Sequence, residues 1–278
     1  EAISQASANQ RKGRCGRISE GVCFRLYSEE DFTARSEFTD PEIIRTNLAS
    51  VILQMLRLRI GDIRDFPFVD APDERLINDG FNLLQELQAV NKKGELTSIG
   101  QQLCRIQADP KMGRMLLTAS KEGALREILI IVAALSVQDP RDRPSDKQQA
   151  ADEKHRQWRD KESDFVTLVN LWEHFEQQRQ DMSRNQFEKY CRQNFVSPLR
   201  MREWRDLHHQ LPGACRELKL IENKQPANYE AVHRSLLSGL LGNIGFQRAD
   251  DEVEGDSQNK PKRRGLPEFS GARNRKFY

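Results

Sequence analysis

Apolar residues recur at helical spacing through most of this chain, and that periodicity limits its fold more than any other feature. Ile44, Leu48 and Val51 show the pattern, and Thr39 and Glu42 just before them have the spacing of a capping box. The spacing predicts helices over 41–59, 74–90, 98–106, 112–122, 126–136, 165–175, 186–195, 199–210 and 229–241. We therefore expect a mainly α protein.

Length and composition favour several compact units. The chain has 278 residues, whereas a typical domain has about 100–200. Hydrophobic residues make up 37% of the sequence, which is enough to build cores. No run approaches the roughly 18–20 apolar residues that a membrane span needs. The net charge of +2 alone indicates no nucleic-acid partner.

Cysteine and histidine usage argues against disulfide and metal chemistry. The five cysteines are odd in number, scattered and without a CxxC pair. Neither a disulfide framework nor a structural zinc site is expected, and the chain is expected in the cytoplasm. The five histidines form no HExxH or HxxxH pair, so we expect no metal-ligating residues.

Three segments depart from the helical pattern. Residues 22–27 are rich in Val, Phe and Tyr, which predicts a strand. Residues 139–164 carry dense mixed charge and few apolar side chains, which predicts a surface loop leading into a solvated helix. Trp158 within it is expected to be a lone exposed side chain. Five acidic residues in 250–256 precede seven basic residues in 260–278.

The order of these elements predicts the domain organisation. Helices followed by a hairpin-like turn favour a winged-helix domain over 28–105, and the later helices favour a helical bundle over 106–247. Residues 248–268 are predicted to be a charged linker or an insertion. Because the sequence opens without a methionine and closes on what looks like an interrupted strand, we expect a fragment of a longer protein.

The strongest local motif is Gln10-Arg11-Lys12-Gly13-Arg14-Cys15-Gly16-Arg17. Arg14 and Arg17 are three residues apart, so on a helix they would share a face. Two guanidinium forks beside glycines suit the oxygens of a transferring phosphate. Spacing alone favours the alternative, an Arg/Gly segment that coats RNA without specificity or solvates the surface, because short Arg/Gly runs are common.

Residues 10–17 resemble the last conserved helicase motif of the DEAH-box RNA helicases, Gln-Arg-x-Gly-Arg-x-Gly-Arg. The residues at 4–10 and 146–150 are most similar to the bacterial HrpA type. Further segments resemble the same family in the same order, namely 21–27, 41–48, 96–100, 134–138, 170–172 and 270–274. The resemblance covers nearly the whole chain.

The resemblance implies an ATP-dependent RNA helicase that couples ATP hydrolysis to translocation on RNA and to its unwinding. It assigns 1–27 to the end of a second RecA-like α/β domain and 269–278 to the start of an OB-like β domain. It also implies that the helical bundle is ratchet-like and lines one wall of the RNA channel. The implied partners are single-stranded or structured RNA, ribonucleoprotein and the RecA-like domains of the same polypeptide.

The resemblance also assigns site residues. Arg14 and Arg17 would be arginine fingers that reach the γ-phosphate of ATP, and Gln10 would position the nucleotide or a water. The sequence departs from the family in having no GxxxxGK[ST] and no Asp-Glu-Ala-His. The ligands of the Mg²⁺ that accompanies ATP are therefore not expected among these residues. We expect the 278 residues alone neither to hydrolyse ATP nor to unwind RNA.

Further basic residues are candidates for RNA contact. Arg200, Arg202 and Arg205 accompany Trp204 on one predicted helix, where they could bind phosphate and stack a base. The alternative is a helix with Leu199, Trp204 and Leu207 packed inward and arginines that extend to solvent. Arg273 lies in a basic strip that suits either phosphate or a solubilising linker. The rival to the helicase function is a non-catalytic RNA-binding or scaffold module.

Overall fold

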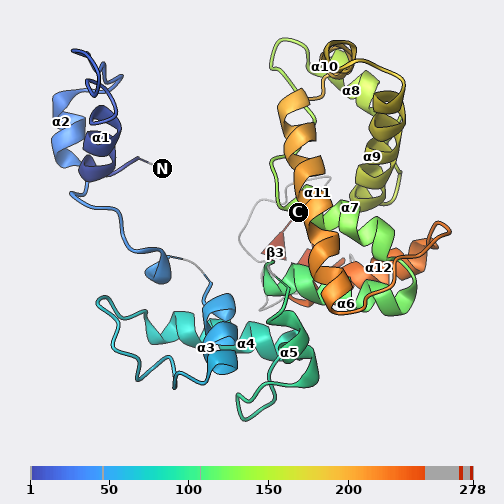
Figure 1. Cartoon of the computed structure of the whole chain (residues 1–278), viewed down its shortest axis with the longest axis horizontal. Helices are drawn as coiled ribbons and strands as arrows, with labels where there is room; N and C mark the ends of the chain where they lie inside the picture. Colours follow the sequence, from blue (N-terminus) through green and yellow to red (C-terminus); the bar gives the residue numbers. More distant parts are fainter. Residues whose placement is uncertain (1, 46, 107, 248–268, 272–275, 278) are drawn as a thin grey trace, which may run out of the picture.

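The computed structural model describes residues 2–45, 47–106, 108–247, 269–271 and 276–277. These residues are mainly helical, which confirms the predicted fold class at that level (Figure 1). The predicted linker over 248–268 and the candidate RNA contact Arg273 lie outside the described residues. No helix in the described ranges combines the length and apolar character needed to cross a membrane.

The first two helices form a small unit at one end of the molecule. Helix α1 (Gln5–Lys12) and helix α2 (Glu29–Ala34) stand apart from the other helices in Figure 1, joined to them by an extended stretch. The backbone N–H of Gln5 donates to Ser36, 3.0 Å away, and its side chain donates to the carbonyl of Arg35. The chain after α2 thus holds the start of α1 in place.

The helix predicted over 41–59 is wrong in its first half. The structure has a 3₁₀ turn, η1 (Glu42–Ile44), and then helix α3 (Ala49–Leu58). Thr39 makes no capping bond there, because its hydroxyl pairs with that of Ser4 at 2.8 Å. Asn47 instead accepts from the backbone N–H of Ala49 at 2.9 Å, close to where the helix begins.

Helix α3 packs against α4 (Glu74–Glu86), and α5 (Ser98–Leu103) closes this part of the core. An isolated antiparallel bridge joins Val90 to Leu96 between α4 and α5. Gly100 lies so close to the turn after α4 that a Cβ there would be 2.1 Å from the carbonyl oxygen of Ala89. The missing side chain is what lets α5 approach this closely.

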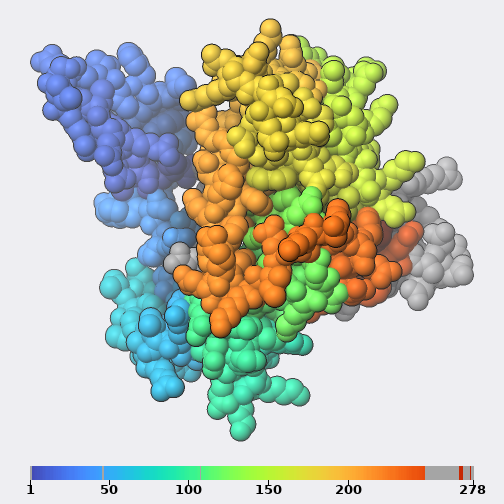
Figure 2. All heavy atoms as spheres, turned by 45° about the vertical axis from the view of Figure 1, so that its right-hand side comes forward, coloured from blue at the N-terminus to red at the C-terminus, as the bar shows by residue number. Residues whose placement is uncertain are grey.

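Helix α7 (Leu125–Leu135) is the centre of the larger helical unit. Its neighbours are α6 (Pro110–Glu122), α9 (Asp164–Gln180), α11 (Pro198–Glu217) and α12 (Tyr229–Leu237). Helix α10 (Arg184–Gln193) bridges α9 and α11. Figure 2 shows the end of α9 and α10, in yellow, at one end of the orange helix α11. Every residue of α7 from Ile128 to Ala134 is apolar and buried, as expected of a helix inside a core.

The charged segment 139–164 is less exposed than predicted. It contains helix α8 (Gln148–His155), and Trp158 after that helix is only 5% exposed. The prediction of a lone exposed tryptophan is therefore wrong. The indole packs against His174 and Phe175 of α9, with ring centroids 5.3 and 5.2 Å away. Trp158 thus anchors a polar segment to the core.

The strand predicted over 22–27 is absent from the described structure. This segment is irregular and exposed, because no neighbouring strand among the described residues offers it backbone hydrogen bonds. The described sheet is a small antiparallel one, in the order β1 (Gly245–Gln247), β2 (Phe269–Gly271) and β3 (Lys276–Phe277). Gly245 pairs with Gly271, and Phe269 pairs with Phe277.

An aromatic cluster fixes α11 to its neighbours. Trp204 is fully buried, and its Nε1 donates to the carbonyl of Ile130 in α7 at 2.9 Å. Trp172 of α9 packs 5.0 Å from Trp204 and 4.5 Å from His208. Burial, followed by the nearby His209, lowers the pKa of His208 to about 4.

Replacement of Gly100 by alanine tests the close approach of α5. Gly100→Ala is expected to lower the free energy of unfolding by about 1–3 kcal/mol, because the new Cβ meets backbone. Gly213→Ala in α11 is the matched control, since nothing lies within 4 Å of an added Cβ there. Urea unfolding followed by circular dichroism measures both. Equal stability of the two variants would contradict the packing described.

The aromatic cluster predicts a pH dependence of stability. Because the ordinary pKa of His208 is 6.5 and its pKa in the folded chain is about 4, the unfolded chain binds the proton first as pH falls. Stability is therefore expected to decrease between these two values. Urea unfolding at a series of pH values measures this loss. His208→Gln should flatten the profile and His209→Gln should not; identical profiles for both variants would refute the assignment.

Candidate functional site

The arginines of the motif lie in a loop rather than on a helix. Helix α1 begins at the cap Ser4 and ends before Gly13, so Gln10 lies in its last turn. Arg14 and Arg17 come after the helix, and Gly16 between them has a φ of +77°. The condition for a shared helical face is therefore not met, because a left-handed glycine turns the chain between them.

The loop is held closed by local contacts. The Cys15 thiol donates to the carbonyl of Val22 at 3.7 Å. A Cβ on Gly21 would lie 2.3 Å from the Cys15 sulfur, so only glycine permits this approach. Arg25 then donates to the side chain of Asn9 in α1 at 2.7 Å and lies over the ring of Phe32. These contacts tie both ends of the loop to α1 and α2.

Gln10, Arg14 and Arg17 are all exposed. Within the described ranges no carboxylate pairs with either arginine, and Arg17 makes only a 3.4 Å hydrogen bond to the carbonyl of Gly13. Two unneutralised guanidinium groups can bind the oxygens of a phosphate. A guanidinium only donates hydrogen bonds and stays protonated, so what these two arginines offer is charge stabilisation.

The described residues offer no metal site. Nowhere in them do three or more His, Cys, Asp or Glu side chains gather closely enough to hold an ion. All five cysteines are free. The guanidinium groups of Arg14 and Arg17 are chemically suited to the oxygens of a phosphate.

Several large apolar side chains in and just after the arginine loop are exposed. Phe24 is 86% exposed and Leu26 is 98% exposed, and Ile18 and Val22 are also exposed. Large exposed apolar patches are uncommon on the surface of a monomeric soluble domain. The loop thus presents both cationic and apolar groups to whatever covers it.

Of the three arginines predicted on α11, Arg200 has a structural contact. Its guanidinium donates to the Asp142 carboxylate at 2.8 Å and to the carbonyl of Asp139 at 3.0 Å. It therefore fastens the loop before α8 to α11. Trp204 is buried between helices, so it cannot stack a base. The alternative of an inward-packed face is therefore confirmed for Trp204 and wrong for Leu199, which is 59% exposed.

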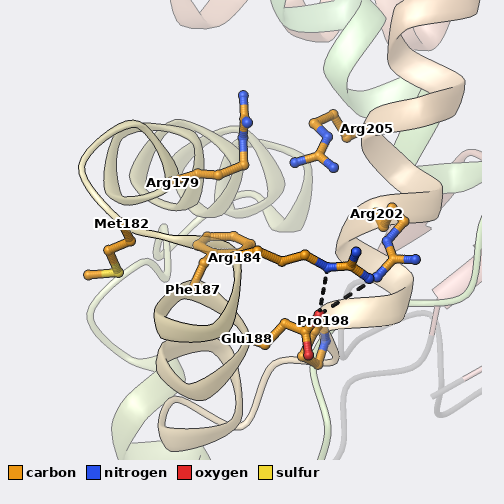
Figure 3. Close-up of a pocket in the computed structure, with 8 residues that line it drawn as sticks. All are labelled: Arg179, Met182, Arg184, Phe187, Glu188, Pro198, Arg202 and Arg205. Atoms are coloured by element: carbon orange, nitrogen blue, oxygen red, sulfur yellow. Dashed lines mark hydrogen bonds and ion pairs between the residues drawn. The ribbon is translucent and has the colours of Figure 1, made fainter.

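Arg202 and Arg205 line a pocket of about 430 Å³ (Figure 3). Arg179 from the end of α9 and Arg184 from the start of α10 line it as well. We call this site, defined by Arg179, Arg184, Arg202 and Arg205, the arginine pocket. Arg179 and Arg184 were not predicted from the sequence, because no local pattern connects them and only the packing of three helices brings them together.

Glu188 is the carboxylate in the lining of the arginine pocket. Its oxygens lie 3.3 Å from Arg184 and 3.8 Å from Arg202, and Arg192 further along α10 pairs with it at 3.3 Å. Arg179 pairs with Glu176 at 3.0 Å. Arg205 has no ion-pair partner within the described part of the chain.

The sequence is similar to a helicase-associated family and to several RNA helicases. Residues 109–168 match the family described as helicase associated domain (HA2), ratchet-like. The ATP-dependent RNA helicase HrpA of Escherichia coli is 52% identical over an alignment that covers the whole chain, and the HrpA homolog of Haemophilus influenzae is 55% identical over 91% of it. The DExH-box ATP-dependent RNA helicase DExH1 of Arabidopsis thaliana is 33% identical over 87% of the chain.

The chain spans about one fifth of the length of the two HrpA proteins and one quarter of DExH1. Identity above one half across nearly the whole chain, together with the ratchet-like domain, places it within one family. The chain belongs to the HrpA-type DEAH-box helicases, of which it represents one region.

Proposed function

We propose that this chain is part of an ATP-dependent RNA helicase and that Arg14 and Arg17 act as its arginine fingers. The observation that carries the proposal is the loop after α1, in which two exposed arginines lie without a carboxylate partner in the described ranges. Relatives named ATP-dependent RNA helicases support it. The activity belongs to the longer polypeptide of which the chain is a part.

In this mechanism the loop stabilises charge in the transition state. Negative charge spreads over the equatorial oxygens of the γ-phosphate during transfer, and arginine fingers are worth about 10³–10⁵ in rate. Arg14 and Arg17 supply the guanidinium forks, and Gln10 positions the nucleotide or the attacking water. The phosphate-binding loop and the Mg²⁺ ligands come from RecA-like domains elsewhere in the polypeptide.

The proposed domain organisation follows the sequence prediction. Residues 1–27 end a RecA-like domain. Their exposed apolar side chains support this assignment, because the rest of such a domain would cover them. Residues 28–105 form a winged helix, supported by α3 to α5 and the Val90–Leu96 bridge. Residues 106–247 form the ratchet-like bundle, and 269–278 begin an OB-like domain.

We also propose that the bundle contributes one wall of an RNA channel and that the protein acts in the cytoplasm. Arg202 and Arg205, which face a common pocket, support the first point. Five free cysteines support the second, because disulfides are rare in that compartment. An RNA-binding scaffold without ATPase activity is the alternative, and in it Arg17 would contribute to RNA binding alone.

Replacement of Arg17 separates the two functions. In the polypeptide that includes the RecA-like domains, Arg17→Ala is expected to lower RNA-stimulated ATP hydrolysis by roughly 10³-fold or more, because the γ-phosphate loses one of its two guanidinium partners. Phosphate release measures turnover, and fluorescence anisotropy measures RNA affinity, which should persist.

Lys12→Ala is the matched control for this experiment. Lys12 is exposed in the last turn of α1 and occupies a variable position of the motif, so turnover should be unchanged. The scaffold function predicts instead that Arg17→Ala lowers only RNA affinity. The slope of log affinity against log salt concentration should then fall by about one. That result would refute the arginine-finger proposal.

A further inference from the structure

We propose that the arginine pocket binds phosphate groups of a single-stranded nucleic-acid backbone and does not distinguish RNA from DNA. The inference rests on the proposed nucleic-acid function and specifies which groups of the strand this part of the bundle binds. It adds Arg179 and Arg184 to the two arginines that the sequence indicated.

The geometry concentrates positive charge from three helices in one place. Figure 3 shows Arg184 extending from α10 toward Arg202 on α11, with Glu188 beside both. Arg179 and Arg205 lie on the other side of the pocket, where Arg205 has no ion-pair partner in the described part of the chain. Guanidinium groups from separate elements can therefore approach one anion from several directions.

The charge in the arginine pocket is only partly neutralised. Four guanidinium groups face two carboxylates, those of Glu176 and Glu188. Glu188 is shared, since Arg192 outside the pocket also pairs with it. The Arg184 side chain is 75% exposed, so an incoming anion can reach it without rearrangement of the core. The pocket thus retains a positive potential that favours an anion.

The lining favours a backbone phosphate over a base. Phe187 is the aromatic residue of the lining, and it is only 9% exposed, so its ring packs inward. Met182 and Pro198 complete the apolar part of the lining and offer no flat face. Base stacking on aromatic faces is the usual source of base contact with single strands. Binding through this pocket should therefore be independent of sequence.

The lining also lacks a free group that would read the 2′-hydroxyl. Glu188 is its one carboxylate among the described residues, and both of its oxygens already face arginines. Arginine side chains only donate, and a charged phosphate oxygen is a better acceptor than a hydroxyl. RNA and DNA strands should therefore bind here with similar affinity.

The test measures binding of two fluorescent probes, an oligouridylate and an oligothymidylate of equal length, to the 278-residue chain by anisotropy at several salt concentrations. Arg205→Gln is expected to weaken both by about tenfold, because it removes a charge-assisted hydrogen bond. The salt slope should fall by about 0.7 for each phosphate that the variant no longer neutralises. In the Arg202→Gln/Arg205→Gln double variant, affinity and salt slope should both decrease further.

Arg216→Gln is the matched control. Arg216 lies in the last turn of the same helix, is exposed and does not line the pocket, so this variant removes one charge from α11 without touching the site. Its affinity should equal that of the unaltered chain. Thermal melting followed by circular dichroism checks that all variants are folded.

Glu188→Gln gives a result in the opposite direction. It removes the carboxylate that competes with phosphate for Arg184 and Arg202, so both probes should bind more tightly. Weaker binding by Glu188→Gln would overturn the proposed competition.

Three results would contradict either phosphate binding by the arginine pocket or its equal affinity for RNA and DNA. Arg205→Gln could bind as the unaltered chain does, it could weaken only the RNA probe, or the unaltered chain could bind neither probe. None of these results bears on ATP turnover, which the Arg17→Ala experiment measures separately.

Discussion

Burial of α7 is the constraint on which the larger helical unit depends. Its apolar side chains need cover on every side, and each fully buried large one contributes about 1.5–3 kcal/mol. Its one buried charge, Glu127, accepts hydrogen bonds from the Asn223 side chain and the Ala227 backbone, so it is not left unpaired. The Ile130 carbonyl in turn accepts the buried N–H of Trp204, which fixes α11 against α7.

The arginine pocket is a consequence of that packing. Helices α9 and α11 both pack on α7, and α10 connects them at one end. Arg179 and Arg205 line the same pocket because their helices share a support. The loop after α1 uses a different principle, since glycines and a few hydrogen bonds hold its arginines outside any core. One site depends on tertiary packing and the other on local chain geometry.

This difference decides what could be predicted from sequence. Long periodic helices and the motif at 10–17 are local signals, and both were identified. The break before α3 was missed because Thr39 pairs with the distant Ser4. The charged neighbours of Trp158 in the sequence predict an exposed side chain, whereas its ring is buried against residues of α9. Arg179 and Arg184 were missed for the same reason: sequence spacing carries no information about contacts between helices.

Residues 22–27 form an exposed and mostly apolar segment that can promote self-association of the chain. Val22 to Tyr27 combine high strand propensity with one charge, and their backbone lies outside any described ladder. Such a segment can pair with its copy in another molecule, as unprotected sheet edges do. Self-association of this region is therefore opposed by its single charge, that of Arg25.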